Sequence, residues 1–190
     1  MEILISKVKN KNQFEEVLEI LKKAHEVNKK NGLLYSTAKL DLPELINKAT
    51  VFEGITFLAS VNGKNVGTAT VCFRSLNYWY HTGMVATIKL VGVLPEYSGK
   101  GIAKNLIQEC IREALKNDIN VIVSDTAEGN VPMKKTFLSL GFVICDYCKY
   151  PGNNFNSDVF VRWLDGFCYD KNIIKKNYLT KKSMILNDDI

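Results

Sequence analysis

The sequence predicts an α/β domain in which a mixed β-sheet of about six to seven strands is flanked by helices. Three observations favour this class: an amphipathic helix near the N-terminus, β-rich segments between residues 55 and 93, and a succession of strand, glycine loop, helix and strand between 84 and 123. That succession is typical of a βαβ unit, whose crossover joins two strands of one sheet. We expect one domain over residues 1–165, followed by a polar tail or extension over residues 166–190.

Two helices are expected before the sheet. In the first, apolar residues recur three and four positions apart, with charged residues between them, and the helix ends before Asn31-Gly32. These apolar residues are Phe14, Val17, Leu18, Leu21 and Ala24. The second helix lies around residues 42–49, because Asp41 suits its start and Pro43 suits its first turn.

Three strands follow the helices. The β-rich runs 55–61 and 66–74 are joined through Asn62-Gly63, which tolerates the positive φ of a tight hairpin turn. The run 84–93 is almost wholly apolar, as expected for a central strand covered on both faces. Between the second and third strands lies the aromatic segment 77–81, which would pack against the sheet edge by default and would alternatively line an acceptor pocket or a homodimer contact.

The second half of the chain alternates helices and strands. A helix starting near Gly101 keeps one apolar face, made of Ala103, Leu106, Ile107, Cys110, Ile111, Ala114 and Leu115. A short strand is expected at 121–123, and a helix at 131–140 with Asn130 as N-cap and Gly141 as its stop. The last strands are expected at 142–150 and 159–164.

Composition excludes several classes of protein. The net charge of +5 is spread along 190 residues rather than gathered into a stripe, which argues against nucleic acid, and no apolar run could span a bilayer. The five cysteines and the lack of a secretory segment predict a cytoplasmic protein with free thiols. Cys145 and Cys148 have no second Cys or His pair, so we expect no metal; on a regular strand they would point to opposite faces.

The segment around Gly99-Lys100-Gly101 carries the main chemical signal. A strand that runs through two glycines into a helix presents free backbone N–H groups at the positive end of the helix dipole. Glycine permits the unusual φ and the close approach of phosphate oxygens, and Lys100 and Lys104 add positive charge. A phosphate-containing ligand is therefore expected there, although a plain strand-to-helix loop would show the same two glycines.

Two segments together resemble a known family. Residues 90–106 read LVGVLPEYSGKGIAKNL, which is similar to the acetyl-CoA motif R/Q-x-x-G-x-G/A of the GNAT N-acyltransferase superfamily. Residues 130–142 resemble that family's second signature, N-x-x-A-x-x-x-Y-x-x-x-G-F, with Asn130, Gly141 and Phe142 in register. The resemblance implies a splayed sheet with acetyl-CoA as co-substrate in the gap between the strands that carry Val91 and Val123.

The resemblance also assigns roles to residues. It implies that main-chain groups of Val91 and Val93 pair with the pantetheine arm, and that Asn130 hydrogen-bonds this arm near the thioester. The expected cofactor-binding set is Val91, Gly92, Val93, Ser98, Gly99, Lys100, Gly101, Ile102, Ala103, Lys104, Asn130 and Phe137. Ser98 departs from the usual Arg or Gln, and Phe137 stands where many members have the Tyr that protonates the departing thiolate, so we expect Phe137 to pack on the arm.

The expected activity is transfer of an acetyl group to a primary amine, from a small molecule or a peptide, by direct attack in a ternary complex. A protonated amine needs a base, and Asp125 and His81 are the candidates, with Glu128 as a further one. For each of them, a purely structural role is the alternative. Because Phe137 cannot donate a proton, the alternative function is a catalytically silent CoA-binding sensor or interaction module.

Overall fold

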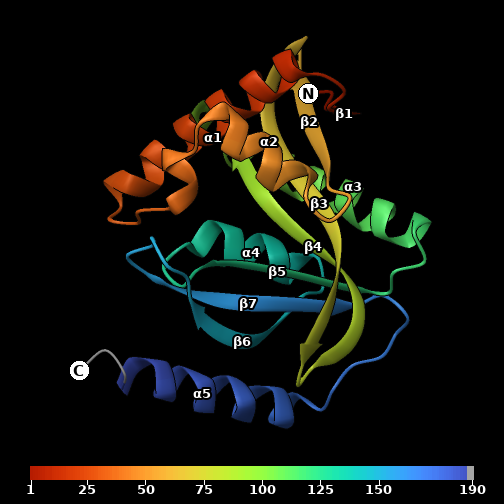
Figure 1. The fold of residues 1–190 in the computed structure, drawn as a ribbon, viewed down its shortest axis with the longest axis vertical. Coiled ribbons are helices and arrows are strands. Elements are labelled where there is room, and N and C mark those ends of the chain that lie inside the picture. Colours follow the sequence, from red (N-terminus) through yellow and green to blue (C-terminus); the bar gives the residue numbers. More distant parts are fainter. Residues whose placement is uncertain (188–190) are drawn as a thin grey trace.

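The computed structural model describes residues 1–187 and contains one seven-stranded mixed sheet with helices on both faces (Figure 1). The strand order is β1-β2-β3-β4-β5-β7-β6, and β4 and β5 pair in parallel while the other neighbours are antiparallel. The predicted α/β class with a mixed sheet is therefore confirmed. The strands are β1 (Leu4–Lys7), β2 (Ile55–Val61), β3 (Lys64–Tyr78), β4 (His81–Val93), β5 (Val121–Ala127), β6 (Val143–Lys149) and β7 (Asn156–Trp163).

Two of the helices begin at the residues that the sequence predicts as their N-caps. Asp41 and Glu44 form a reciprocal capping box at the start of α2, and Asn130 accepts a hydrogen bond from the Met133 N–H at the start of α4. The helices are α1 (Lys11–Lys30), α2 (Leu42–Thr50), α3 (Ile102–Lys116), α4 (Val131–Ser139) and α5 (Lys171–Asn187), with the short 3₁₀ turns η1 (Ser36–Lys39) and η2 (Pro95–Tyr97).

Two strand glycines let helices approach the sheet closely, one on each face. A Cβ at Gly92 would lie 3.1 Å from the Leu21 side chain of α1, and a Cβ at Gly67 would lie 2.8 Å from the Ile102 side chain of α3. Gly92 and Gly67 point to opposite faces, because Gly92 pairs with Thr68, the next residue after Gly67. We call these faces the α1 face and the α3 face.

The structure differs from the sequence predictions in several details. Strand β1 has no counterpart among the predictions, and the segment 77–81 forms the tip of one long β3–β4 hairpin, where Tyr80 is buried. On α3, Leu115 is exposed although its position predicted burial, whereas Glu113 is buried. Glu113 tolerates burial because Lys7 of β1 donates to its carboxylate at 2.8 Å and Lys116 lies 3.4 Å away.

The C-terminal part adds a bulge and a helix. Cys145 and Cys148 pack in the same apolar cluster, not on opposite faces, because a bulge between Ile144 and Asp146 inserts one residue into β6. Within residues 166–187 the chain forms α5, which lies against β6 (Figure 1). No helix formed by residues 1–187 has the length and apolar character needed to cross a bilayer.

Candidate functional site

Strands β4 and β5 separate soon after they meet. Their parallel register holds for two pairs, Ala86 with Ile122 and Thr87 with Val123, although both strands continue beyond these residues. At the point of separation the Ser124 hydroxyl donates to the Ile88 carbonyl at 3.0 Å, so a side chain replaces the missing ladder bond. The strands therefore form a fork that opens toward Val93 and Ala127.

The β4 arm of the fork carries a bulge. Lys89 pairs with Thr70 and Gly92 with Thr68, so Leu90 and Val91 together oppose the single residue Ala69. Leu90 has a φ of 52°, which is unusual for a residue with a side chain. The bulge interrupts regular pairing of β4 just before Val91, Gly92 and Val93, the residues predicted to contact a cofactor arm.

The glycine loop continues from β4 through η2 to the N-terminus of α3. Gly99 and Gly101 have φ values of 74° and 80°, so both positions use the left-handed region that glycine adopts without strain. Within residues 1–187, no hydrogen bond uses the backbone N–H groups of residues 99–104. Six consecutive donors at a helix N-terminus suit a doubly charged anion such as a pyrophosphate.

The two lysines of this loop, Lys100 and Lys104, differ in their contacts. Lys100 donates to the Glu96 carbonyl at 3.0 Å and lies 4.9 Å from the centre of the Tyr97 ring, whereas Lys104 is exposed and makes no interaction with the described residues. Ser98 ends η2, and its N–H donates to the Pro95 carbonyl. The free donors that residues 99–104 present are therefore main-chain N–H groups and not lysine side chains.

The far arm of the fork ends at Asn130, whose side chain uses both of its polar atoms. The Asn130 Oδ1 caps α4, and the Asn130 Nδ2 donates to the Tyr35 hydroxyl at 3.1 Å. Tyr35 belongs to the segment between α1 and α2, which sequence reasoning did not connect to Asn130. The Tyr35 ring lies between His25 and Phe155, with centroid distances of 4.6 and 4.5 Å.

Hydrogen bonds tie the segment 31–41 to the loop 150–155 across the fork. The Asn153 and Asn154 side chains accept from the Ser36 and Leu34 N–H groups at 2.8 and 2.7 Å, and the Asn154 Nδ2 donates to the Gly32 carbonyl. The sequence does not predict these contacts, because no local pattern relates two loops 120 positions apart.

His25 of α1 also contacts the segment 31–41, through its ring nitrogens. The Asn28 Nδ2 can only donate, so the His25 Nδ1 accepts it at 3.3 Å and the His25 Nε2–H donates to the Thr37 hydroxyl at 2.9 Å. Burial lowers the pKa of His25 to about 4, which keeps the ring neutral at physiological pH.

Asp125 lies on β5 inside the fork and on the α1 face. Its side chain is reached by solvent, yet the surrounding protein raises the pKa of the carboxyl, against the opposing influence of the Ser157 and Tyr150 hydroxyls and of Arg74. The Tyr150 hydroxyl is 3.5 Å from the Asp125 Oδ1. A carboxylate with a raised pKa accepts a proton more readily than an ordinary one, so Asp125 remains the best candidate base.

The other candidates for catalysis do not join Asp125. His81 lies opposite Tyr78 at the tip of the β3–β4 hairpin, and none of the interactions between described residues connects it to Asp125. Glu128 accepts from Tyr147 at 2.6 Å and pairs with Lys182 of α5. Burial alone would raise the pKa of Glu128, but these two partners outweigh burial and lower it.

Phe137 has its ring enclosed in the core, with 1% of its surface exposed and the rings of Phe142 and Phe160 at 5.2 and 5.0 Å. At this position the ring supports α4 and carries no proton to donate. Among residues 1–187, no group of His, Cys, Asp and Glu gathers in a way that could hold a metal ion.

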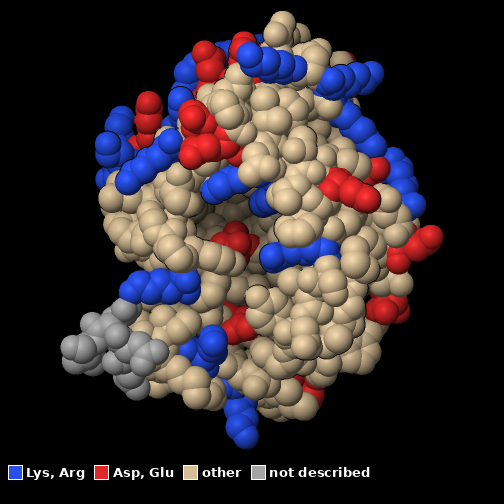
Figure 2. Space-filling view, in the orientation of Figure 1, with Lys and Arg blue, Asp and Glu red and all other residues tan. Residues whose placement is uncertain are grey.

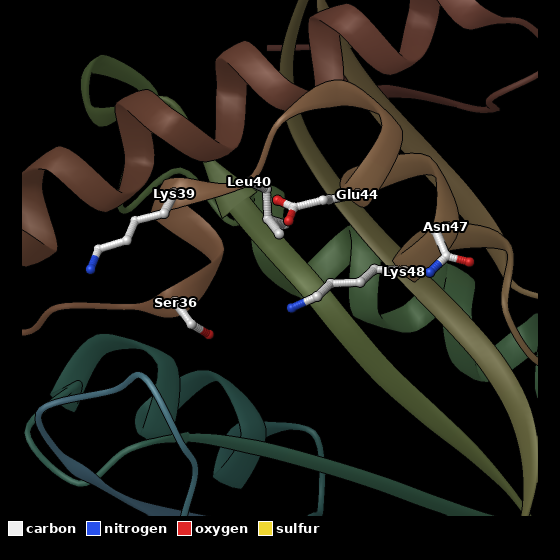
Figure 3. A pocket seen from close by; sticks show the side chains of 6 residues that line it. All are labelled: Ser36, Lys39, Leu40, Glu44, Asn47 and Lys48. Carbon is white, nitrogen blue, oxygen red and sulfur yellow. The ribbon is translucent and has the colours of Figure 1, made fainter.

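A recess opens on the α1 face between the α1–α2 segment and the β5 side of the fork. Figure 2 shows the hollow in the middle of this view, with basic side chains around it and acidic atoms at its floor. Beside it, η1 and α2 line a cavity of about 420 Å³, and Figure 3 shows Lys48 extending from α2 across the front of β4. The cavity is lined by Ser36, Lys39, Leu40, Glu44, Asn47 and Lys48.

Comparison with known proteins identifies one matching family model and several similar folds. Residues 14–142 match the model of the acetyltransferase (GNAT) family, and no curated protein matches the chain. An N-acetyltransferase from Staphylococcus aureus Mu50 is similar in fold, with a TM-score of 0.68 and 19% identity, over 87% of this chain and 100% of that one.

Two further solved structures have the same fold. A ribosomal-protein-alanine N-acetyltransferase from Brucella melitensis has a TM-score of 0.66 and 20% identity, over 85% of this chain and 99% of that one. A GNAT family acetyltransferase from Elizabethkingia anophelis, solved with acetyl-CoA bound, has a TM-score of 0.62 and 18% identity, over 85% of this chain and 98% of that one. Sequence identities this low show similarity of fold alone.

Proposed function

The chain belongs to the acetyltransferase (GNAT) family, and from that premise we propose that it transfers an acetyl group from acetyl-CoA to a primary amine by direct attack in a ternary complex. The observation that carries the proposal is the row of six unbonded N–H groups at residues 99–104, next to the fork between β4 and β5. Solved relatives of the same fold contain acetyl-CoA or CoA, which supports the choice of co-substrate.

Each part of the fork has its own role in binding acetyl-CoA. The N–H groups of residues 99–104 hold the pyrophosphate, main-chain groups of Val91 and Val93 pair with the pantetheine arm, and the Nδ2 of Asn130 faces the same arm. Acetyl-CoA supplies the acetyl group as a thioester that an amine can attack. Main-chain N–H groups beyond the bulge at Leu90 stabilise negative charge on the thioester oxygen, since fixed dipoles need no reorganisation during the reaction.

Asp125 acts on the amine. An amine attacks only in its neutral form, and a lysine-like amine with a pKa near 10.4 is mostly protonated at pH 7. The Asp125 carboxylate, whose pKa the surrounding protein raises, accepts this proton directly or through a water molecule. Asp125 belongs to β5 and pairs with Val159 of β7, so the sheet fixes its place beside the fork.

The central experiment measures thiol release from acetyl-CoA with a panel of primary amines. Wild-type protein is expected to turn over at least one acceptor, and Asp125→Asn is expected to lower kcat by about 100-fold, the usual contribution of a general base. Asp165→Asn, outside the fork, is the matched control and should keep wild-type rates. Absence of thiol release with every amine, despite CoA binding, would remove the enzymatic proposal.

A second candidate function is a CoA-binding module without catalysis, and the buried Phe137 favours it, because this side chain replaces a proton donor. Phe137→Tyr separates the two functions. Strong activation by the new hydroxyl would indicate a decayed active site, whereas an unchanged rate would indicate that water or another group protonates the thiolate. A thiolate with an ordinary pKa of about 8.5 can leave near neutral pH with such help.

A further inference from the structure

Three neighbouring strands place charged side chains on the α1 face, where the recess opens. The β3–β4 register places Thr70, Cys72 and Arg74 opposite Lys89, Thr87 and Val85, so all six side chains point to one face. Thr87 in turn pairs with Val123, which puts Asp125, two residues further along β5, on this face as well. The hydrogen bond from the Arg74 Nε to the Thr87 hydroxyl at 3.1 Å agrees with this arrangement.

Three lysines around the recess have no partner. Lys39 at the end of η1 and Lys48 on α2 line the cavity of about 420 Å³, and Lys89 is half-buried beside the β4 bulge. None of the three makes an ion pair or hydrogen bond with any residue from 1 to 187. A half-buried ammonium without a partner loses hydration and gains nothing from the protein, so Lys89 favours an anion from outside.

The acidic groups of the recess do not neutralise these lysines. Glu44 directs its carboxylate to the N-terminus of α2, where it accepts from the Asp41 N–H at 3.2 Å. Asp125 lies at the fork, beside Tyr150. The recess therefore has a basic side near α2 and an acidic point at the fork, which is the distribution that a ligand with one negative and one positive end requires.

We propose that the acceptor is a primary amine that also carries a carboxylate, bound with its carboxylate at Lys39, Lys48 and Lys89 and its amine at Asp125. The inference rests on the proposed function and names its substrate class. The cavity volume suits an amino acid or the first residues of a peptide. Ser36 and Asn47 add polar groups to the cavity for the acceptor.

The position of the cavity next to the fork follows from contacts of neighbouring residues. Ser36 lines the cavity, and the preceding residue, Tyr35, accepts from Asn130. A Cβ at Gly129 would lie 3.6 Å from Leu33, so the α1–α2 segment touches the chain immediately before Asn130. The α1–α2 segment that lines the cavity is therefore the segment that contacts Asn130, the residue expected at the thioester.

The test compares matched acceptors that differ only in the carboxylate. One arm uses a free amino acid and its carboxamide, and the other uses a dipeptide amide with Asp or with Asn in the second position. The wild-type protein should favour the carboxylate acceptor by about 10-fold in kcat/KM, since three ion pairs at partly exposed positions each contribute modestly, and added salt should reduce this preference. The arm with the larger preference identifies the source of the carboxylate.

Variants then locate the preference. The triple variant Lys39→Met, Lys48→Met and Lys89→Met should bring the carboxylate-to-amide ratio close to one, and Lys39→Glu with Lys48→Glu should lower the ratio below the wild-type value. Lys175→Met on α5, another exposed lysine without a partner, should keep the wild-type ratio. CoA binding by calorimetry checks that each variant is folded, and titration of the protein–CoA complex with each acceptor gives the ratio of affinities without turnover.

The outcomes separate the two proposals. Equal turnover of carboxylate and amide acceptors by the wild-type protein, or a preference that survives in the triple variant Lys39→Met, Lys48→Met and Lys89→Met, overturns the inference and leaves the acetyltransferase proposal standing. Thiol release from none of the acceptors removes the acetyltransferase proposal. In that case a calorimetric preference for the carboxylate would still support the binding site, and equal affinities would overturn it.

Discussion

The two sides of the fork between β4 and β5 are built from different parts of the chain. On the cofactor side, the bulge at Leu90, the glycines of the loop and the N-terminus of α3 are features of the main chain, close together in sequence. On the acceptor side, the α1–α2 segment, the loop 150–155 and Asn130 are held by side chains from distant positions. The cofactor side therefore depends on backbone conformation, and the acceptor side depends on the chemistry of individual side chains.

This difference predicts that pH affects the two sides unequally, with His25 responsible for the largest effect. The folded-state pKa of His25 is about 4 and its unfolded value is about 6.5, so the unfolded chain binds its proton first as the pH falls. The stability that the neutral ring contributes is complete above pH 6.5. It is lost progressively as the pH falls from 6.5 to 4, and the loss amounts to roughly 3 kcal/mol.

Urea unfolding at pH 7 and pH 4.5 measures this effect. His25→Gln keeps polar groups near Asn28 and Thr37 but does not titrate, so it should lose less stability than wild type over this interval, by about 2 to 3 kcal/mol. The comparison with wild type removes the contribution of the carboxylates, which both proteins share. If the two proteins lost stability equally, His25 would not be the group that makes the acceptor side sensitive to acid.

The cofactor side should instead respond to a change of backbone. Gly101→Val places a β-branched residue at a φ of 80°, where residues with a side chain are strained by about 2 kcal/mol, although only the Asn105 side chain lies within 4 Å of the new Cβ. Relief of this strain moves the N–H groups, so the Kd for CoA by calorimetry should rise by about 30-fold.

Gly32→Val is the matched control for Gly101→Val. Gly32 also has a φ of 80° and open space around its Cα, but it follows α1 and lies outside the glycine loop. Both variants should lose stability, and only Gly101→Val should weaken CoA binding. Equal affinities in the two variants would contradict a pyrophosphate site made of main-chain amides.

The contrast between local main-chain features and distant side-chain contacts also explains which parts of the site the sequence predicts. The glycine loop, the N-cap at Asn130 and the stop at Gly141 are local, because a few adjacent residues determine the backbone there, and the sequence predicts all three. The contact of Tyr35 with Asn130 spans 95 positions, and the bulge in β6 depends on its pairing with β7. Contacts of this kind are decided by tertiary packing, so no periodicity or motif in the chain records them.

The hydrogen bond between Tyr35 and Asn130 joins the two sides, and its removal should have the smallest of these effects. Tyr35→Phe keeps the ring between His25 and Phe155 and removes only the hydroxyl, which should lower kcat/KM for the acceptor by about 5-fold, the usual worth of one hydrogen bond. Tyr78→Phe, an exposed ring at the hairpin tip, should change nothing.

Asn130→Ser keeps an N-cap for α4 but is too short to reach Tyr35, so the double variant with Tyr35→Phe should be no worse than Asn130→Ser alone. Additive losses in this cycle would mean that the two residues act separately. The hydrogen bond with Tyr35 would then not position Asn130, the residue expected at the thioester.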